Sequence, residues 1–202
     1  MVSNSNGKWK RFKGTRRLYP KPKLSWTVYK AYLNHDWLYV FDYLLGNDLP
    51  ISEPQQKGID IHRDIEVKGL AETSNLSKLP PLTGAEYEKV VLKDYPDFYI
   101  IGKVDCLTDS CLLDWKTGGM SGYEAQLQLY MYLTKKDMGY LVSVNQDREV
   151  GKVYQYEAWD DGELYWDSRF EQMYLDLEEK IEEMAAYSRT GTLHNWINFN
   201  DE

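Results

Sequence analysis

The chain has 202 residues, of which 43% are hydrophobic and 14% aromatic, and its formal net charge is -8. A chain of this length and apolar content can bury a sizeable core. It has no apolar run near the roughly eighteen residues that a membrane span needs, and its basic start lacks the apolar core of a signal peptide. We therefore expect a protein without a membrane partner, located in the cytoplasm.

Basic residues gather at the start of the chain. Residues 1–24 hold eight Lys and Arg and no acidic residue, so they carry +8 and the remainder carries -16. An acidic chain is a poor generic binder of nucleic acid, because affinity depends on neutralising phosphates. A basic segment interleaved with aromatic residues can still follow a nucleic-acid backbone and stack on bases. We expect residues 1–23 to form a flexible basic arm, and a merely solubilising tail is the alternative. The candidate nucleic-acid contacts in this arm are Lys10, Arg11, Arg16 and Arg17.

Two helices are expected before the middle of the chain. Leu24-Ser25 opens an aromatic-rich helix that continues through Tyr43. Residues 55–70 have the spacing of an amphipathic helix, and this helix carries His62. Glu66 lies one turn after His62, close to the same face. By itself, a histidine on such a helix is more often a surface residue than a ligand.

The middle of the chain predicts an antiparallel hairpin. Residues 98–107 and 111–115 are apolar, β-branched and aromatic runs that flank three turn formers. With a two-residue turn, Asp105 lies directly opposite Asp114, with Cβ atoms roughly 4.5 to 5.5 Å apart. Because side chains alternate along a strand, Lys116 lies on the same face as Asp114. Two carboxylates and an ammonium group are therefore expected to converge.

This convergence points to a particular chemistry. Two like charges so close repel each other, and the arrangement persists only with a shared proton or a bound cation. A hard divalent cation fits two carboxylates best, and a lysine beside it suits a phosphate oxyanion or an attacking water. Together these groups can hydrolyse a phosphodiester. The alternative is that Asp105 and Asp114 are solvated on an exposed face and that Lys116 is an ordinary cross-strand partner.

The remaining pattern is that of an α/β protein. A helix over residues 123–134 would place Gln126 and Tyr130 on one face. Other expected elements are a helix over 84–93, strands over 140–144 and 150–159 beside the hairpin, and a long acidic helix over 160–186. Such alternation of strands and helices predicts an α/β layered domain.

The order of these motifs resembles the RecB-like and phage-exonuclease branch of the PD-(D/E)xK nuclease superfamily. Five elements between residues 24 and 134 carry the resemblance: Leu24-Ser25, His62, Gly102-x-x-Asp105, Asp114-x-Lys116 with Thr117-Gly118, and Gln126-x-x-x-Tyr130. The resemblance implies a restriction-endonuclease-like core, with a central mixed sheet flanked by helices, and a single nuclease domain over residues 24–202.

The resemblance also implies a role for each candidate residue. Asp105 and Asp114 would bind Mg²⁺ or Mn²⁺ together with the main-chain carbonyl of Trp115, and His62 would complete the metal shell. Lys116 would position or activate the attacking water. The supporting candidates are Gln126 and Tyr130, which would contact nucleic acid or hold the hairpin, and Glu66 as an accessory residue.

The cysteines limit the cofactors. Some relatives in this branch hold an iron-sulfur cluster with four cysteines, whereas this chain has only two, Cys106 and Cys111. No cluster is therefore expected. With the hairpin turn above, Cys106 pairs with Leu113 instead of Cys111, so both are expected to be buried thiols.

The implied function is a metal-dependent DNA nuclease, in recombination, repair or phage DNA processing. An exonuclease acting on DNA ends or single strands is favoured over a sequence-specific endonuclease, because no added recognition segment is evident. A catalytically silent nucleic-acid-binding or assembly subunit with the same fold is the alternative. DNA is the expected partner, and nothing in the sequence indicates an oligomer interface.

Overall fold

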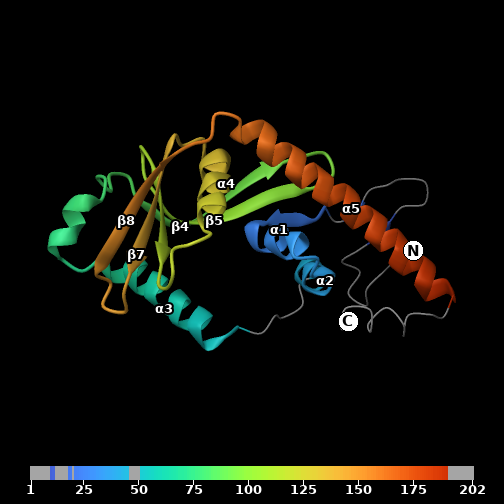
Figure 1. Cartoon of the computed structure of the whole chain (residues 1–202), viewed down its shortest axis with the longest axis horizontal. Coiled ribbons are helices and arrows are strands. Elements are labelled where there is room, and N and C mark those ends of the chain that lie inside the picture. The colour runs from blue at the N-terminus through green and yellow to red at the C-terminus, as the bar shows by residue number, and fades with distance from the viewer. Residues whose placement is uncertain (1–9, 12–17, 20, 46–50, 191–202) are drawn as a thin grey trace. The chain divides into compact units, whose positions relative to one another are not determined.

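The computed structural model describes residues 10–11, 18–19, 21–45 and 51–190 (Figure 1). Contacts within the chain divide it into two compact units. The first unit comprises residues 1–48, 94–100 and 167–202, and the second comprises residues 49–93 and 101–166.

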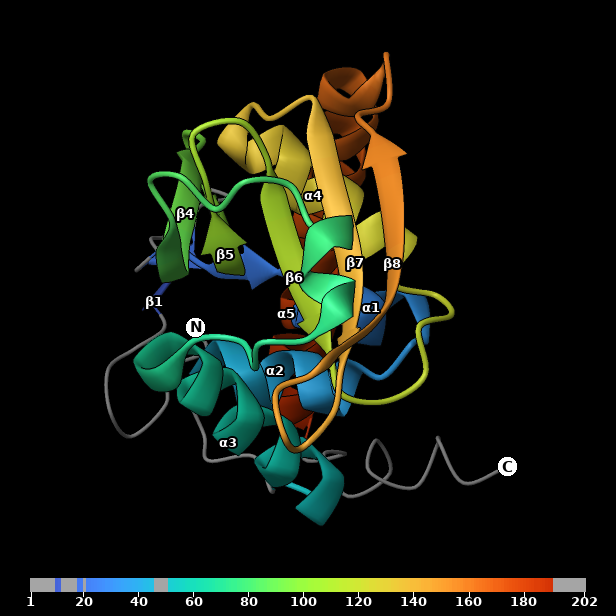
Figure 2. The ribbon, with the colours of Figure 1, turned by 90° about the vertical axis from the view of Figure 1, so that its left-hand side faces the viewer.

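A mixed β-sheet forms the centre of the fold. Its strands are β3 (Lys23–Ser25), β4 (Glu86–Asp94), β5 (Tyr99–Leu107), β6 (Leu112–Lys116), β7 (Met138–Val144) and β8 (Val150–Glu157). The strand order is β3-β5-β6-β7-β8, and β4 also pairs with β5. β6 runs antiparallel to β5 and parallel to β7, and β8 runs antiparallel to β7 (Figure 2). The fold is therefore α/β with a central mixed sheet, as the sequence predicts.

Three helical segments belong to the second unit: α3 (Glu53–Lys68), the 3₁₀ helix η1 (Ser74–Lys78) and α4 (Glu124–Thr134). α3 begins with a capping box, in which the side chains of Ser52 and Gln55 each bond the other residue's backbone N–H. α4 joins β6 to β7, because parallel strands need a crossover connection. This helix matches the one predicted over residues 123–134.

The two helices α3 and α4 cover opposite faces of the sheet. Ile65 of α3 belongs to a core cluster with Trp115 and Val142. α4 instead lies against Gly139, where an added Cβ would come within 2.6 Å of Met131 Sδ. Since successive residues of a strand point to opposite faces, Gly139 and Val142 of β7 face different helices.

The predicted hairpin register is confirmed. Cys106 pairs with Leu113, and the N–H of Thr108 donates to the carbonyl of Cys111 at 2.9 Å. This is the register that places Asp105 opposite Asp114. Cys106 and Cys111 are free and buried, as the register predicts.

Two predicted helices differ from the structure. Residues 84–93 were expected to be helical, but β4 occupies this segment, because pairing with β5 and the β-branched Val90 and Val91 favour a strand. The aromatic helix expected from Leu24 to Tyr43 is two helices, α1 (Trp26–Leu33) and α2 (Trp37–Leu45). The chain breaks between them at His35, whose φ is 58°.

Aromatic residues form much of the first unit. Its other elements are β1 (Lys10–Arg11), β2 (Leu18–Tyr19), which pairs antiparallel with β1, and most of α5 (Gly162–Thr190). The rings of Tyr29 and Phe170 lie 5.1 Å apart, and the hydroxyl of Tyr32 donates to Asp176 at 2.6 Å. These contacts attach α1 to α5. None of the described helices has both the length and the apolar content that a membrane crossing requires.

We expect Gly139→Ala to destabilise the protein. The new Cβ would overlap Met131 and Leu127 of α4, and such overpacking costs about 1 to 3 kcal/mol in the free energy of unfolding. Urea denaturation followed by circular dichroism measures the loss. Gly119→Ala is the matched control, because no atom lies within 4 Å of an added Cβ there. Equal stability of the two variants would contradict this account of the packing.

Candidate active site

Asp105 lies at the point where the hairpin ladder ends. Beyond the pair of Cys106 and Leu113, the N–H of Trp115 donates to Oδ2 of Asp105 at 2.8 Å. In a regular antiparallel ladder this N–H would donate to a main-chain carbonyl of β5. The carboxylate has taken the place of that carbonyl. It is thereby held against β6, with its other oxygen, Oδ1, 3.4 Å from Nδ1 of His62.

His62, Glu88 and Asp105 form a cluster of candidate metal ligands from α3, β4 and β5. One ligand atom from each lies within 4.8 Å of the others. Their side chains are partly accessible, at 22%, 22% and 12% of full exposure respectively. One imidazole nitrogen with carboxylate oxygens is a donor set suited to Mn²⁺, and the oxygens also suit Mg²⁺. These residues therefore fit the divalent cation that the resemblance implies.

Glu88 was missed in the sequence, because a helix was expected over residues 84–93. Its φ is 52°, in the left-handed region that non-glycine residues seldom adopt. Strained backbone of this kind gathers at functional sites. Glu88 also forms an ion pair with Lys103 of β5. The β-branched Val90 and Val91 are a local signal that favours a strand here, but they do not place Glu88 beside β5.

Asp114 is almost completely buried, at 1% exposure. Nζ of Lys116 lies 2.5 Å from its Oδ2 and forms an ion pair with it. Among the described residues, none donates a well-aligned hydrogen bond to this oxygen, so the ion pair is its main compensation. Burial, together with the charge of Asp105, raises the pKa of Asp114 to about 7, against the opposing effects of Lys116 and His62.

The same charges act on His62. Burial by itself lowers the pKa of the imidazole, but the hydrogen bond and charge of Asp105, with the charges of Glu88 and Asp114, raise it above its ordinary value overall. The surrounding carboxylates therefore favour the protonated form of the imidazole.

Lys116 is held on three sides. Besides Asp114, its Nζ donates to Oε1 of Gln126 at 3.2 Å and lies 4.0 Å from the centre of the Tyr123 ring. Nε2 of Gln126 in turn donates to the hydroxyl of Tyr130 at 2.8 Å. The structure thus brings together Lys116, Gln126 and Tyr130, as the predicted helix face requires.

Gly102 allows this arrangement. A Cβ at Gly102 would lie 2.9 Å from the ring of Tyr130, so only glycine lets the ring approach β5 this closely. The first residue of the Gly102-x-x-Asp105 motif therefore has a steric role, while the last is a candidate ligand.

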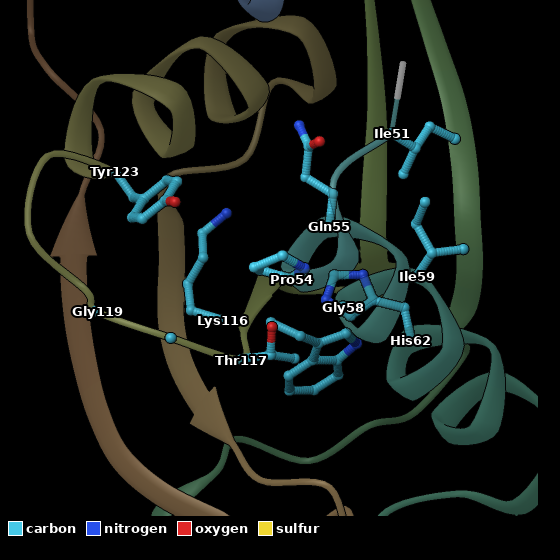
Figure 3. A pocket seen from close by; sticks show the side chains of 12 residues that line it. Ile51, Pro54, Gln55, Gly58, Ile59, His62, Lys116, Thr117, Gly119 and Tyr123 are labelled. Carbon is cyan, nitrogen blue, oxygen red and sulfur yellow. The ribbon is translucent and has the colours of Figure 1, made fainter. Parts of the chain in front are cut away.

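A cavity of about 510 Å³ opens beside these groups. Figure 3 shows α3 along one side, with His62, and the end of β6 with the following loop along the other, with Lys116 and Tyr123. The two sides come close at Gly58, where an added Cβ would be 3.2 Å from Oγ1 of Thr117. The lining residues are Ile51, Pro54, Gln55, Gly58, Ile59, His62, Trp115, Lys116, Thr117, Gly118, Gly119 and Tyr123.

Other predicted site residues are not gathered here. Glu66 is exposed on α3, and the cluster around His62 contains Glu88 in its stead. Trp115 contributes its N–H to Asp105, while a metal contact through its carbonyl stays a prediction. The side chains of Lys10 and Arg11, and Arg16 and Arg17 entirely, lie outside the described residues, so the nucleic-acid role of the arm also stays a prediction.

The raised pKa of Asp114 predicts how stability changes with pH in the absence of metal. Below pH 3.8, the ordinary pKa, Asp114 is protonated in both the folded and the unfolded protein. Between pH 3.8 and about 7, Asp114 has lost its proton in the unfolded protein but keeps it in the folded protein. Stability therefore falls as pH rises through this window. At about 1.4 kcal/mol per pKa unit the loss is on the order of 1 to 4 kcal/mol.

In Asp114→Asn, stability should fall less steeply with rising pH. The raised pKa of His62 also makes stability fall as pH rises, and it does so in the wild type and in the variant. The measurement is urea denaturation in EDTA from pH 4 to pH 8. Asp147→Asn, at an exposed position in the turn between β7 and β8, is the control and should keep the wild-type slope. An unchanged slope in Asp114→Asn would exclude Asp114 as its source.

The comparisons with known proteins concern the fold. No protein-family model matches the sequence, and no curated protein matches it either. The crystal structure of an alkaline exonuclease, LHK-Exo, from Laribacter hongkongensis aligns with a TM-score of 0.52 and 16% identity over 83% of this chain and 94% of that chain. The structure of LHK-Exo in complex with dAMP aligns with a TM-score of 0.54 and 17% identity over 81% of this chain and 93% of that chain. The chain therefore has the exonuclease-like fold, a mixed sheet flanked by helices, that its resemblance to the PD-(D/E)xK branch implies.

Proposed function

We propose that this chain is a metal-dependent deoxyribonuclease that hydrolyses phosphodiester bonds. The observation that carries the proposal is the position of Lys116, whose ammonium group is fixed against Asp114 beside the cluster of His62, Glu88 and Asp105. A cation-binding cluster next to a fixed ammonium group suits a substrate whose reacting centre is a negatively charged phosphate.

The metal ligands in this proposal are His62, Glu88, Asp105 and Asp114, and the metal is Mg²⁺ or Mn²⁺. A divalent cation bound there lowers the pKa of a bound water and neutralises charge that develops on the phosphate. The donor set supports this assignment, because a divalent cation compensates the mutual repulsion of clustered carboxylates.

Lys116 has the central role among the protein's own groups. Its ammonium, held by Asp114 and Gln126, positions the attacking water or donates to the phosphate oxygen on which charge accumulates. Gln126 and Tyr130 are positioning residues, since they act through Lys116. Because the lysine is already fixed in place, little reorganisation is needed during the reaction.

The finer proposal is an exonuclease that acts on DNA ends or single strands. Its support is the shared fold with LHK-Exo, an alkaline exonuclease whose complex with dAMP has been solved. Recombination, repair or phage DNA processing are the processes that such an activity serves.

We expect Lys116→Ala to lower the rate of DNA cleavage by about 100-fold or more, the usual cost of removing one such donor. Labelled linear single-stranded and double-stranded DNA is incubated with Mg²⁺, Mn²⁺ or EDTA, and products are resolved on a gel. Lys152→Ala, which removes an exposed lysine on β8, is the control and should cut like wild type. Circular DNA that stays intact while linear DNA is degraded to mononucleotides identifies an exonuclease. Binding of DNA by the wild type without cleavage under any metal would instead indicate a catalytically silent subunit.

Glu88→Gln should weaken metal binding while the protein remains folded. Removing the charge of one ligand lowers the affinity for a hard cation. Even the loss of a group that only supports a ligand lowers metal affinity by about 10- to 100-fold. Isothermal titration with Mn²⁺ gives the dissociation constant. Glu86→Gln, two residues earlier on β4 and exposed, is the matched control. If both variants bind Mn²⁺ as tightly as wild type, Glu88 is not a ligand.

A further inference from the structure

The carboxylate of Glu88 is shared between the candidate metal site and a lysine beside it. Its Oε1 lies 3.9 Å from Nδ1 of His62 and so faces the cluster of His62, Glu88 and Asp105. Its other oxygen, Oε2, forms an ion pair with Nζ of Lys103. One oxygen of this carboxylate is therefore available to a cation in the cluster, while the other is already engaged.

Lys103 reaches Glu88 from the neighbouring strand, β5. Val104 is fully buried, and because side chains alternate along a strand, Lys103 and Asp105 both point to the opposite side. β4 pairs with β5, which brings Glu88 within reach of both residues. The backbone φ of Glu88 is 52°, a conformation that a non-glycine residue keeps only where the surrounding structure holds it. Both the strand pairing and the lysine thus fix the direction of this carboxylate.

Folding stability gives little reason for this ion pair. The side chain of Lys103 is 61% exposed, and an ion pair with so exposed a partner contributes little to the free energy of unfolding. Its effect on a bound cation is more direct. A carboxylate with two free oxygens can bind a cation through both, whereas Glu88 with Oε2 engaged by Lys103 offers Oε1 alone.

The number of available carboxylate oxygens distinguishes between divalent cations. Ca²⁺ takes about six to eight oxygen ligands in flexible geometry and accepts both oxygens of one carboxylate. Mg²⁺ is smaller and demands nearly ideal octahedral geometry, which a single oxygen from each carboxylate fits better, and Mn²⁺ is also found in octahedral oxygen sites. A lysine that engages one oxygen of Glu88 therefore disfavours Ca²⁺ more than the smaller cations.

Building on the metal site of the function proposed above, we propose that Lys103 sets the cation selectivity of the cluster by restricting Glu88 to one ligand oxygen. The site then prefers Mg²⁺ or Mn²⁺ and discriminates against Ca²⁺. Lys103 is a positioning residue, since it acts through Glu88 and not on the substrate.

Isothermal titration of the full chain with Mn²⁺ and with Ca²⁺ gives the ratio of the two dissociation constants. Both cations carry the same charge, so the loss of a neighbouring positive charge shifts both affinities alike, and the ratio reports the available oxygens. Lys103→Met should raise the affinity for Ca²⁺ relative to Mn²⁺ by about tenfold, the lower end of what groups that support ligands contribute. Lys103→Arg keeps a cationic donor for Oε2 and should keep the wild-type ratio.

Lys89→Met is the matched control. Lys89 is 43% exposed and forms an ion pair with another glutamate of β4, Glu86, which lies outside the cluster formed by the described residues. The charge change is the same, so the ratio should stay at the wild-type value. Glu88→Gln tests the route of the effect: in that variant, adding Lys103→Met should no longer change the ratio, because the carboxylate through which the lysine acts is gone.

The outcomes separate this inference from the nuclease function. An unchanged ratio in Lys103→Met, or an equal change in Lys89→Met, would overturn the selectivity role while cleavage by the wild type leaves the nuclease function standing. If the ratio changes as expected but the wild type cleaves DNA with no metal, the selectivity role stands and the nuclease function fails. A wild type that binds neither cation overturns both.

Discussion

The candidate site depends on one buried charge, the carboxylate of Asp114, which is 1% exposed. A buried carboxylate is costly unless an opposite charge accompanies it. Lys116 supplies that charge from the same strand, at 2.5 Å. Because β7 pairs with β6 from Leu112 to Lys116, the spacing of Asp114 and Lys116 is set by the pleat of a strand and not by a loop. The backbone positions of both residues are therefore fixed by the sheet.

The contacts of Lys116 also connect β6 to α4. The ammonium group reaches Gln126, which in turn reaches Tyr130, and the ring of Tyr130 rests where Gly102 has no side chain. A second glycine, Gly139, lets the same helix approach β7. The close packing of α4 on β5, β6 and β7 thus holds Nζ of Lys116 in position. A group that is to act on a phosphate must be held to within a fraction of an ångström, and packing of this kind provides it.

The sequence predicts the structure correctly where local rules decide it. A short turn and a two-residue side-chain period specify the hairpin register, and with it the opposition of Asp105 and Asp114. It was insufficient at Glu88, because residues 84–93 mix charged residues with a β-branched run, and pairing with β5 decides between helix and strand. The break at His35 had a local signal, since the side chain of Asp36 accepts from the N–H of Tyr39 and caps α2. Long-range pairing leaves no such mark in the sequence.

The carboxylates and the cavity lining have opposite electrostatic roles. Asp105, Asp114 and Glu88 gather negative charge that repels itself, and a bound cation removes this repulsion and stabilises the folded state by mass action. The cavity lining carries no carboxylate among its described residues, so an anionic ligand there faces Lys116 and His62. In the proposed function, a cation bound at the cluster would therefore both stabilise the fold and reduce the repulsion of a phosphate.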